Sequence, residues 1–197
     1  MNHSLEYFSR QFESQIARGE FALNPFETRA LPYLRGQVID LGCGLGNLAL
    51  AAGRRRLDVK ALDGCPHAVT SLQKRADAER LAVRADVAEL STWKADGLYD
   101  SVVCIGLLMF FRCETARVLI GELRRSTRPG GVLVLNVLVE GTTFMSMFER
   151  DAYCLFPQHE LRALFEDWSV LEEVVEAFPA GQGELKRFVT LIARAPG

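Results

Sequence analysis

The chain has 197 residues, the length of a single domain, and its composition is that of a folded globular protein. Hydrophobic residues make up 49% and charged residues 24%, with a net charge of −2, which disfavours disorder and general electrostatic binding to nucleic acid. The first residues lack a basic stretch followed by an apolar run, and the longest apolar run, 132–139, is interrupted by Asn136. We therefore expect no signal peptide, no membrane partner and no nucleic-acid partner.

Cysteine and histidine usage predicts a reduced protein without a metal centre. The number of cysteines is odd, no two of them form a C-x-x-C pair, and several fall in predicted buried strands or turns. The histidines are scattered along the chain. We therefore expect free thiols, a cytoplasmic location and no bound metal. The cysteines are Cys43, Cys65, Cys104, Cys113 and Cys154.

Residues 1–36 predict a helical segment ahead of the first strand. Apolar residues recur at helical spacing over 4–17. Pro25 suits the first turn of a second helix over 25–34. By themselves these patterns predict packing helices. The apolar residues of the first helix are Leu5, Phe8, Phe12 and Ile16.

The stretch 38–52 predicts a strand, a tight turn and the start of a helix. Its apolar lead ends near Asp40, glycines then follow at every second position, and an alanine- and leucine-rich run comes next. Glycine permits positive φ and has no Cβ to keep a ligand from the backbone, as a nucleotide-like ligand at a strand-to-helix turn requires. We expect a strand over 37–41 and a helix over 46–56. The glycines are Gly42, Gly44 and Gly46.

The spacing of these glycines distinguishes two kinds of cofactor. The dinucleotide-binding fingerprint G-x-G-x-x-G needs glycine at the position where this chain has Asn47. This argues against a nicotinamide-dependent oxidoreductase, which is a less favoured alternative. The acid-x-G-x-G-x-G order that begins at Asp40 instead resembles motif I of the class I S-adenosylmethionine-dependent methyltransferases.

Acids also follow the next two predicted strands. Asp63 stands after a strand over 58–62, where a carboxylate can accept hydrogen bonds from both hydroxyl groups of a ribose. Asp86 and Val87 follow a strand over 81–85. The resemblance implies that Asp86 binds the adenine amino group and that the Val87 amide reaches a ring nitrogen. Without the resemblance, Asp86 would be interpreted as a helix cap.

The order of the elements predicts an α/β fold. The resemblance implies a doubly wound Rossmann-like sandwich, with a seven-stranded, mostly parallel sheet of order 3-2-1-4-5-7-6, the last strand antiparallel, and helices on both faces. It makes 37–197 one methyltransferase domain and implies that 1–36 lies over the cofactor as a helical cap. The elements predicted after residue 63 are helices over 66–79, 113–127 and 157–165 and strands over 98–105, 132–139, 168–178 and 185–194.

The residues expected beside the methyl acceptor are apolar. The stretch 106–111 follows the strand over 98–105, has no polar side chain to orient an amine, and lacks the N-P-P-[YF] sequence of many nitrogen methyltransferases. Met109 and Phe110 are candidates for a substrate pocket, with core packing as the alternative for each. The connection 140–156 is long for a compact domain, which predicts a functional or mobile loop.

The later part of the chain resembles the tellurite-resistance methyltransferase branch. This resemblance implies methylation of tellurite, selenite or a related small nucleophile. Arg187 occupies the position of an active-site arginine of that branch, whereas the histidine of that branch has no counterpart, because 177–184 is shorter and contains none. The acceptor therefore stays open between oxyanions, thiols and related molecules. The resemblance rests on 107–111, on 156–161 with Asp167 and Trp168, and on 186–194.

The sequence thus predicts methyl transfer from S-adenosylmethionine to a small-molecule nucleophile, with S-adenosylhomocysteine as product. A non-catalytic S-adenosylmethionine-binding protein is the alternative, and the oligomeric state stays open between monomer and homodimer. Tyr153 and His159 join Arg187 as catalytic candidates, since a base is needed only if the nucleophile arrives protonated. The predicted cofactor-binding residues are Asp40, Gly42, Cys43, Gly44, Gly46, Asp63, Gly64, Asp86, Val87 and Ile105.

Overall fold

Alternating strands and helices build one seven-stranded sheet with the order β3-β2-β1-β4-β5-β7-β6. The computed structural model describes residues 3–197 and, from residue 6 onward, their side chains. β7 runs antiparallel to its neighbours β5 and β6, and the other neighbouring pairs are parallel, so the predicted fold class is confirmed. The strands are β1 Gln37–Leu41, β2 Asp58–Asp63, β3 Val83–Val87, β4 Tyr99–Ile105, β5 Thr127–Leu138, β6 Ser169–Pro179 and β7 Leu185–Arg194.

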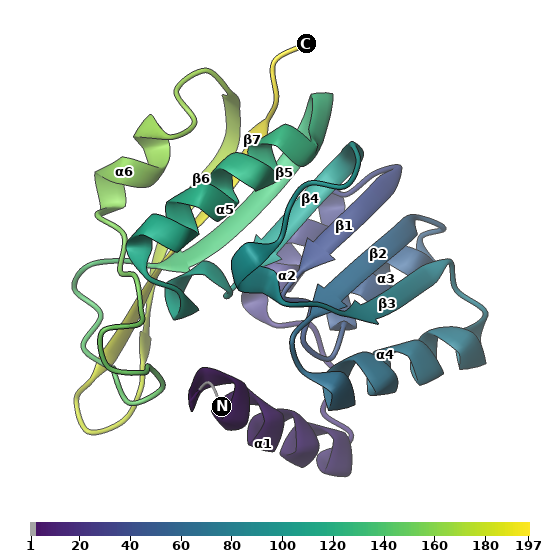
Figure 1. Ribbon diagram of the computed structural model, residues 1–197, viewed down its shortest axis with the longest axis horizontal. Helices are drawn as coiled ribbons and strands as arrows, with labels where there is room; N and C mark the ends of the chain where they lie inside the picture. The colour runs from purple at the N-terminus through teal and green to yellow at the C-terminus, as the bar shows by residue number, and fades with distance from the viewer. Residues whose placement is uncertain (1–2) are drawn as a thin grey trace.

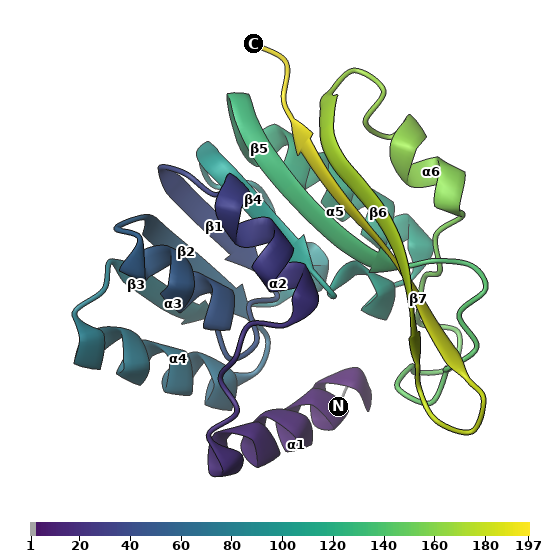
Figure 2. The same ribbon diagram turned by 180° about the vertical axis from the view of Figure 1, so that it is seen from behind.

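Helices cover both faces of this sheet, and α1 lies across the edge where the strand arrows of β1, β2 and β4 end (Figures 1 and 2). One apolar cluster joins the sheet to α2, α3 and α4, and a second joins it to α5 and α6. Neighbouring residues of one strand divide between the clusters, Val38 in the first and Ile39 in the second, as the period of two requires. The helices are α1 His3–Arg18, α2 Pro25–Ala30, α3 Asn47–Arg54, α4 Pro66–Glu79, α5 Cys113–Ser126 and α6 Gln158–Ala163.

Two strands, β3 and β5, begin two or more residues away from the positions predicted. α4 ends on Arg80, whose φ of 54° is left-handed, and the Leu81 N–H bonds back to the Ala76 carbonyl. Because of this cap, β3 begins at Val83 and not at residue 81. Asp86 and Val87 are therefore its last residues and do not follow it.

β5 begins earlier than predicted. Its first residue, Thr127, pairs with Tyr99 of β4, and the register then shifts before Ser101 pairs with Val132. Residues 128–131, which separate the predicted helix over 113–127 from the predicted strand over 132–139, therefore belong to an irregular start of β5.

The N-terminal segment holds both of the predicted helices. α1 packs Phe12 and Ile16 against a small cluster formed by Leu45, Cys65 and Ala68. Leu5, the first apolar position of the predicted helix, lies outside the described side chains.

α2 is closed at its start by a reciprocal cap. The Asn24 side chain accepts a hydrogen bond from the Glu27 N–H at 2.9 Å, and the Asn24 N–H donates to the Glu27 carboxylate at 2.8 Å. Glu27 is thereby held in one orientation at the edge of the sheet.

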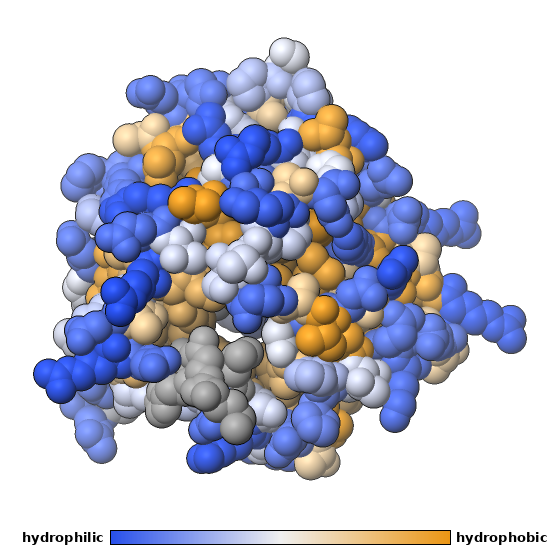
Figure 3. Space-filling model, in the orientation of Figure 1, coloured by the Kyte–Doolittle hydropathy of each residue, from blue (hydrophilic) through white to orange (hydrophobic). Residues whose placement is uncertain are grey.

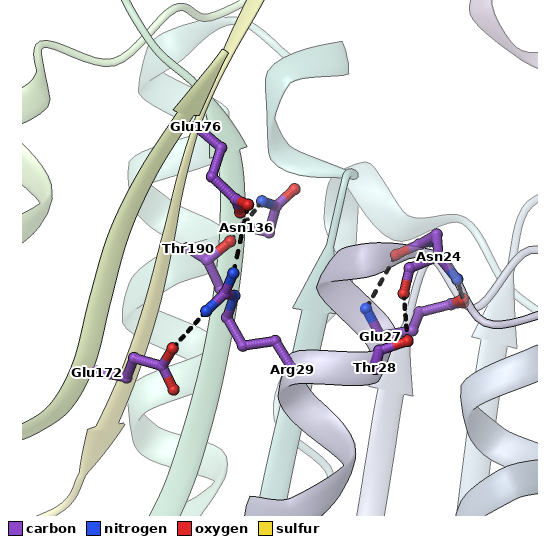
Figure 4. Close-up of polar contacts among 8 residues, drawn as sticks. All are labelled: Asn24, Glu27, Thr28, Arg29, Asn136, Glu172, Glu176 and Thr190. Carbon is purple, nitrogen blue, oxygen red and sulfur yellow. Dashed lines mark hydrogen bonds and ion pairs between the residues drawn. The ribbon is translucent and has the colours of Figure 1, made fainter. Parts of the chain in front are cut away.

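An ion-pair cluster ties α2 to β6 (Figure 4). The Arg29 guanidinium donates to Glu172 at 2.6 Å and to Glu176 at 3.3 Å. The Tyr33 hydroxyl also donates to Glu172, at 2.8 Å. These side chains are about a quarter exposed, so solvent screens them only partly. The cluster therefore anchors α2 to β6, the strand at one edge of the sheet.

The expectation that all cysteines are free thiols was wrong for two of them. Cys113 at the start of α5 and Cys154 in the 140–156 connection form a disulfide across a sequence separation of 41. The folded chain brings their Cα atoms to 4.7 Å, which no local spacing pattern reveals. The remaining cysteines, Cys43, Cys65 and Cys104, are free and buried.

Hydrophilic side chains cover most of the face seen in Figure 3, and apolar side chains show there only in small groups. Among the helices that the structure describes, none combines the length and the apolar character needed to cross a bilayer.

Candidate functional site

A cavity of about 660 Å³ opens at the carboxyl edge of the sheet. Its walls come from α1, α2, the turn after β1, the ends of β2, β4 and β5, and the start of β7. This volume is in the range of small-molecule sites, and the carboxyl edge of a doubly wound sheet is where such folds bind ligands.

The glycine turn between β1 and α3 forms one wall of the cavity. Gly42, Gly44 and Gly46 all have positive φ, between 53° and 74°. A Cβ on Gly42 would lie 3.0 Å from the Cβ of Leu107, so the close approach of the turn to the segment after β4 depends on glycine.

Asp63 joins the end of β2 to this turn. One carboxylate oxygen accepts the Gly44 N–H at 2.8 Å and the other accepts the Cys65 N–H at 2.8 Å. The turn is therefore held in place before any ligand arrives. Burial raises the pKa of Asp63, while these backbone hydrogen bonds oppose the rise.

Three carboxyl groups lie near one another in the cavity lining, beside the glycine turn. Asp40, Glu27 and Asp63 all line it. Burial, followed by the nearby charges of Glu27 and Asp63, raises the pKa of Asp40 to about 8. Burial likewise raises the pKa of Glu27. A cationic ligand would relieve this concentration of negative charge.

The predicted cofactor-binding residues divide into two groups. Those that line the cavity are Asp40, Gly42, Cys43, Asp63, Gly64, Val87 and Ile105. Gly44, Gly46 and Asp86 lie outside its lining. Gly44 and Gly46 belong to the turn behind the wall, and Asp86 pairs with Arg84 at 2.9 Å near the surface. The adenine contact of Asp86 stays a prediction.

The opposite end of the cavity is apolar and rich in aromatic rings. Met109 and Phe110, the predicted pocket residues, both line it. Phe110 packs edge-on against Phe8 of α1, with ring centroids 4.9 Å apart. The ring of Phe26 in α2 lies tilted against that of Phe188 in β7, with centroids 4.7 Å apart. α1 and α2 thus supply aromatic side chains to the cavity lining.

The three catalytic candidates lie outside the cavity lining. Arg187 donates to the Glu140 carbonyl at 3.2 Å and so helps to hold the connection after β5. The Tyr153 ring stacks on Phe148 at 5.2 Å and is partly exposed. His159 lies on the exposed side of α6. No observation assigns these residues a catalytic role.

Several polar residues of the cavity were not predicted, among them Glu27, Asn136 and Lys186. Asn136 had a sequence signal, since it is the single polar residue in the apolar run of β5. Lys186 lies with its Nζ 4.3 Å from the centroid of the Phe144 ring, and burial lowers its pKa. Glu27 and Lys186 had no signal, because only the fold brings α2 and β7 to one cavity.

This fold and this acid-lined glycine turn are those of the class I S-adenosylmethionine-dependent methyltransferases. The family described as tellurite resistance protein TehB matches residues 5–187, and the chain belongs to this family.

Curated relatives are similar to the chain over most of its length. The chain is 23% identical over 201 residues to the probable S-adenosyl-L-methionine-dependent methyltransferase TehB of Haemophilus influenzae, covering 96% of this chain and 66% of the relative. It is 31% identical over 173 residues to hemagglutinin 1 of Eikenella corrodens, covering 82% and 55%. The chain thus spans between about half and two thirds of the length of these curated relatives.

Solved structures share the fold. The crystal structure of TehB from Haemophilus influenzae superposes with a TM-score of 0.78 at 20% identity, over 98% of this chain and 67% of that one. The N-methyltransferase NodS from Bradyrhizobium japonicum, in complex with S-adenosylhomocysteine, gives a TM-score of 0.72 at 16% identity, over 96% and 99%. At this identity the likeness concerns the fold.

S-adenosylmethionine is the cofactor of this class, and the residues present fit it. Its sulfonium and ammonium groups are cations, and the cavity lining places Asp40, Glu27 and Asp63 together with raised pKa values. The glycine turn gives a ligand access to backbone atoms. In the part of the chain that the structure describes, no cluster of three or more His, Cys, Asp or Glu is arranged to hold a metal ion.

Proposed function

We propose that this protein transfers the methyl group of S-adenosylmethionine to a small-molecule nucleophile. The observation that carries this proposal is the division of one cavity into an acid-lined end at the glycine turn and an apolar, aromatic end under α1 and α2. The first end suits a cationic methyl donor. The second suits an acceptor that enters without a large hydration shell.

Methyl transfer requires the protein mainly to align the methyl donor with the nucleophile. In methyl transfer the nucleophile's lone pair bonds to the methyl carbon, the carbon–sulfur bond breaks with its electrons kept by sulfur, and a protonated nucleophile releases its proton to water. Alignment of two reactants alone can supply roughly 7–11 kcal/mol of the barrier. Met109, Phe110 and Phe26 would hold the acceptor and exclude water. Asp63 keeps the glycine turn in place through its two hydrogen bonds to backbone amides.

The apolar end favours a thiol or another weakly hydrated nucleophile as acceptor. An oxyanion such as tellurite is the second candidate, because the matched family is named for tellurite resistance and Lys186 places a cation in the lining. Among the residues that line the cavity, no other lysine or arginine accompanies it. An oxyanion would therefore lose most of its hydration for one cationic contact.

Two measurements test the proposal. S-adenosylhomocysteine should raise the melting temperature of the protein and NAD should not. A methyl-labelled S-adenosylmethionine assay against thiols, selenite, tellurite and small amines should then show transfer. A shift with NAD instead would support an oxidoreductase. Binding without transfer to any acceptor would support a non-catalytic binding protein.

A further inference from the structure

A buried amide in the cavity lining has a polar atom with no partner. Asn136 lies near the end of β5, is 0% exposed, and lines the cavity. Its Nδ2 donates to the hydroxyl of Thr190 on β7 at 2.9 Å. Its Oδ1 is buried and has no hydrogen-bond partner among the described residues. Figure 4 shows this oxygen pointing away from Arg29 and Glu176.

An unpaired buried carbonyl is unfavourable in a folded protein. Leaving such an acceptor without a partner is destabilising, whereas an apolar residue of similar shape at this position would avoid that cost. The other residues of β5 from 133 to 138 are apolar and fully buried, so the strand does not require a polar residue here. A ligand that donates to Oδ1 would supply the missing partner.

The position of Asn136 points to the acceptor rather than to the cofactor. The glycine turn follows β1, and β4 separates β1 from β5 in the sheet. Across the ladder, Thr190 pairs with Asn136 and Phe188 pairs with Leu138, so Phe188 lies two residues further along the same face of β7. Phe188 packs on Phe26 and both line the cavity. The amide is therefore adjacent to the aromatic walls.

We propose that Asn136 binds the methyl acceptor by accepting a hydrogen bond from it, and that the acceptor is a small aromatic molecule carrying an O–H, N–H or S–H at its nucleophilic atom. Thr190 holds the amide through Nδ2, which leaves Oδ1 to accept the hydrogen bond from the ligand. This inference rests on the proposed function and adds the acceptor's chemistry to it. Toluene-like molecules without a donor would fit the walls and leave the amide unpaired.

The test compares phenol with toluene. The two probes have a similar shape, but only phenol can donate a hydrogen bond. Their dissociation constants are measured by calorimetry on the full chain, with and without S-adenosylhomocysteine. Phenol should bind about tenfold more tightly than toluene, the size of effect expected for satisfying one buried acceptor. In Asn136→Leu/Thr190→Val, which replaces both partners by apolar side chains, this preference should disappear, the melting temperature should be no lower than that of the wild type, and the affinity for S-adenosylhomocysteine should stay unchanged.

Two further variants separate binding from stability. Thr190→Val alone keeps the amide but removes the hydroxyl that orients it, so the preference for phenol should shrink. Ser101→Ala removes a fully buried hydroxyl of β4 that pairs with the backbone of Arg35, so it should lower stability and leave the preference intact.

Three results would overturn the inference. These are equal binding of phenol and toluene to the wild type, a preference that survives in the double variant, and a loss of S-adenosylhomocysteine affinity in that variant. If the wild type binds no S-adenosylhomocysteine, the proposed function fails, whereas the probe comparison without it still reports on Asn136.

Discussion

The carboxylate of Asp63 accepts the backbone N–H of Gly44 at 2.8 Å, so the acid at the end of β2 holds the glycine turn that follows β1. Asp63 therefore both holds the turn and lines the cavity. Asp63→Ala should weaken binding of S-adenosylhomocysteine by about 1–3 kcal/mol and also lower the melting temperature, because an amide of the turn loses its charged acceptor. Calorimetry and thermal unfolding measure the two effects. Unchanged affinity would remove Asp63 from the site.

Asp40 should make the stability of the fold depend on pH. Its pKa is about 8 in the fold against 3.8 in an unperturbed carboxyl group, so the folded protein binds more protons than the unfolded chain between these values. Raising the pH from 4 to 8 therefore removes stability, a trend that Asp40→Asn should reduce, with the remainder due to Glu27 and Asp63, whose pKa values are also raised.

A cationic ligand favours the ionised carboxylate and should reverse the rise in pKa. The affinity for S-adenosylmethionine is expected to increase by up to about tenfold per pH unit toward pH 8 and to level off above it. Calorimetry at pH 7 in buffers of different ionisation enthalpy should show proton release on binding. Asp40→Asn should bind without releasing that proton; release of equal size would assign the proton to another group.

The Cys113–Cys154 disulfide should stabilise the fold measurably. It closes a sequence separation of 41, for which the chain-entropy estimate is about 4 kcal/mol. Cys113→Ser/Cys154→Ser should lower the free energy of unfolding by about 2–4 kcal/mol in urea titrations. Adding reductant should destabilise the wild type similarly and leave the double variant unchanged. Two free thiols at these positions in the purified protein, found by mass spectrometry, would contradict the pairing.

Gly46 and Gly106 form a matched pair for testing the turn. Both have positive φ, 68° and 70°, but a Cβ on Gly46 would overlap the buried side chain of Leu72, whereas one on Gly106 would meet nothing within 4 Å. Gly106→Ala should cost about 1–2 kcal/mol from backbone strain alone. Gly46→Ala should cost about 1–3 kcal/mol more, from overpacking. Equal costs in urea titrations would show that Leu72 moves aside freely.

The order and kind of the strands and helices followed from the sequence, and their ends did so less well. The apolar run of β5 predicted a central strand because only a strand buried on both faces tolerates it. The start of β3 was predicted wrongly because the left-handed cap at Arg80, a residue that rarely adopts positive φ, has no sequence signal. The early start of β5 was also missed. It depends on the pairing of Thr127 with Tyr99 of the neighbouring strand, which no local pattern in the sequence indicates.

By itself, the sequence determined the α/β fold class and the glycine turn with its acids, from Asp40 through the glycines to Asp63. This part is local, because each residue lies at the end of a strand or in the turn that follows it, where residue type and spacing report backbone conformation directly. Only the tertiary structure decided the rest: that Glu27 of α2 joins those acids, that Asn136 and Lys186 face the aromatic end, and that Cys113 pairs with Cys154. These residues meet through packing between elements far apart in the chain, and no local pattern encodes such contacts.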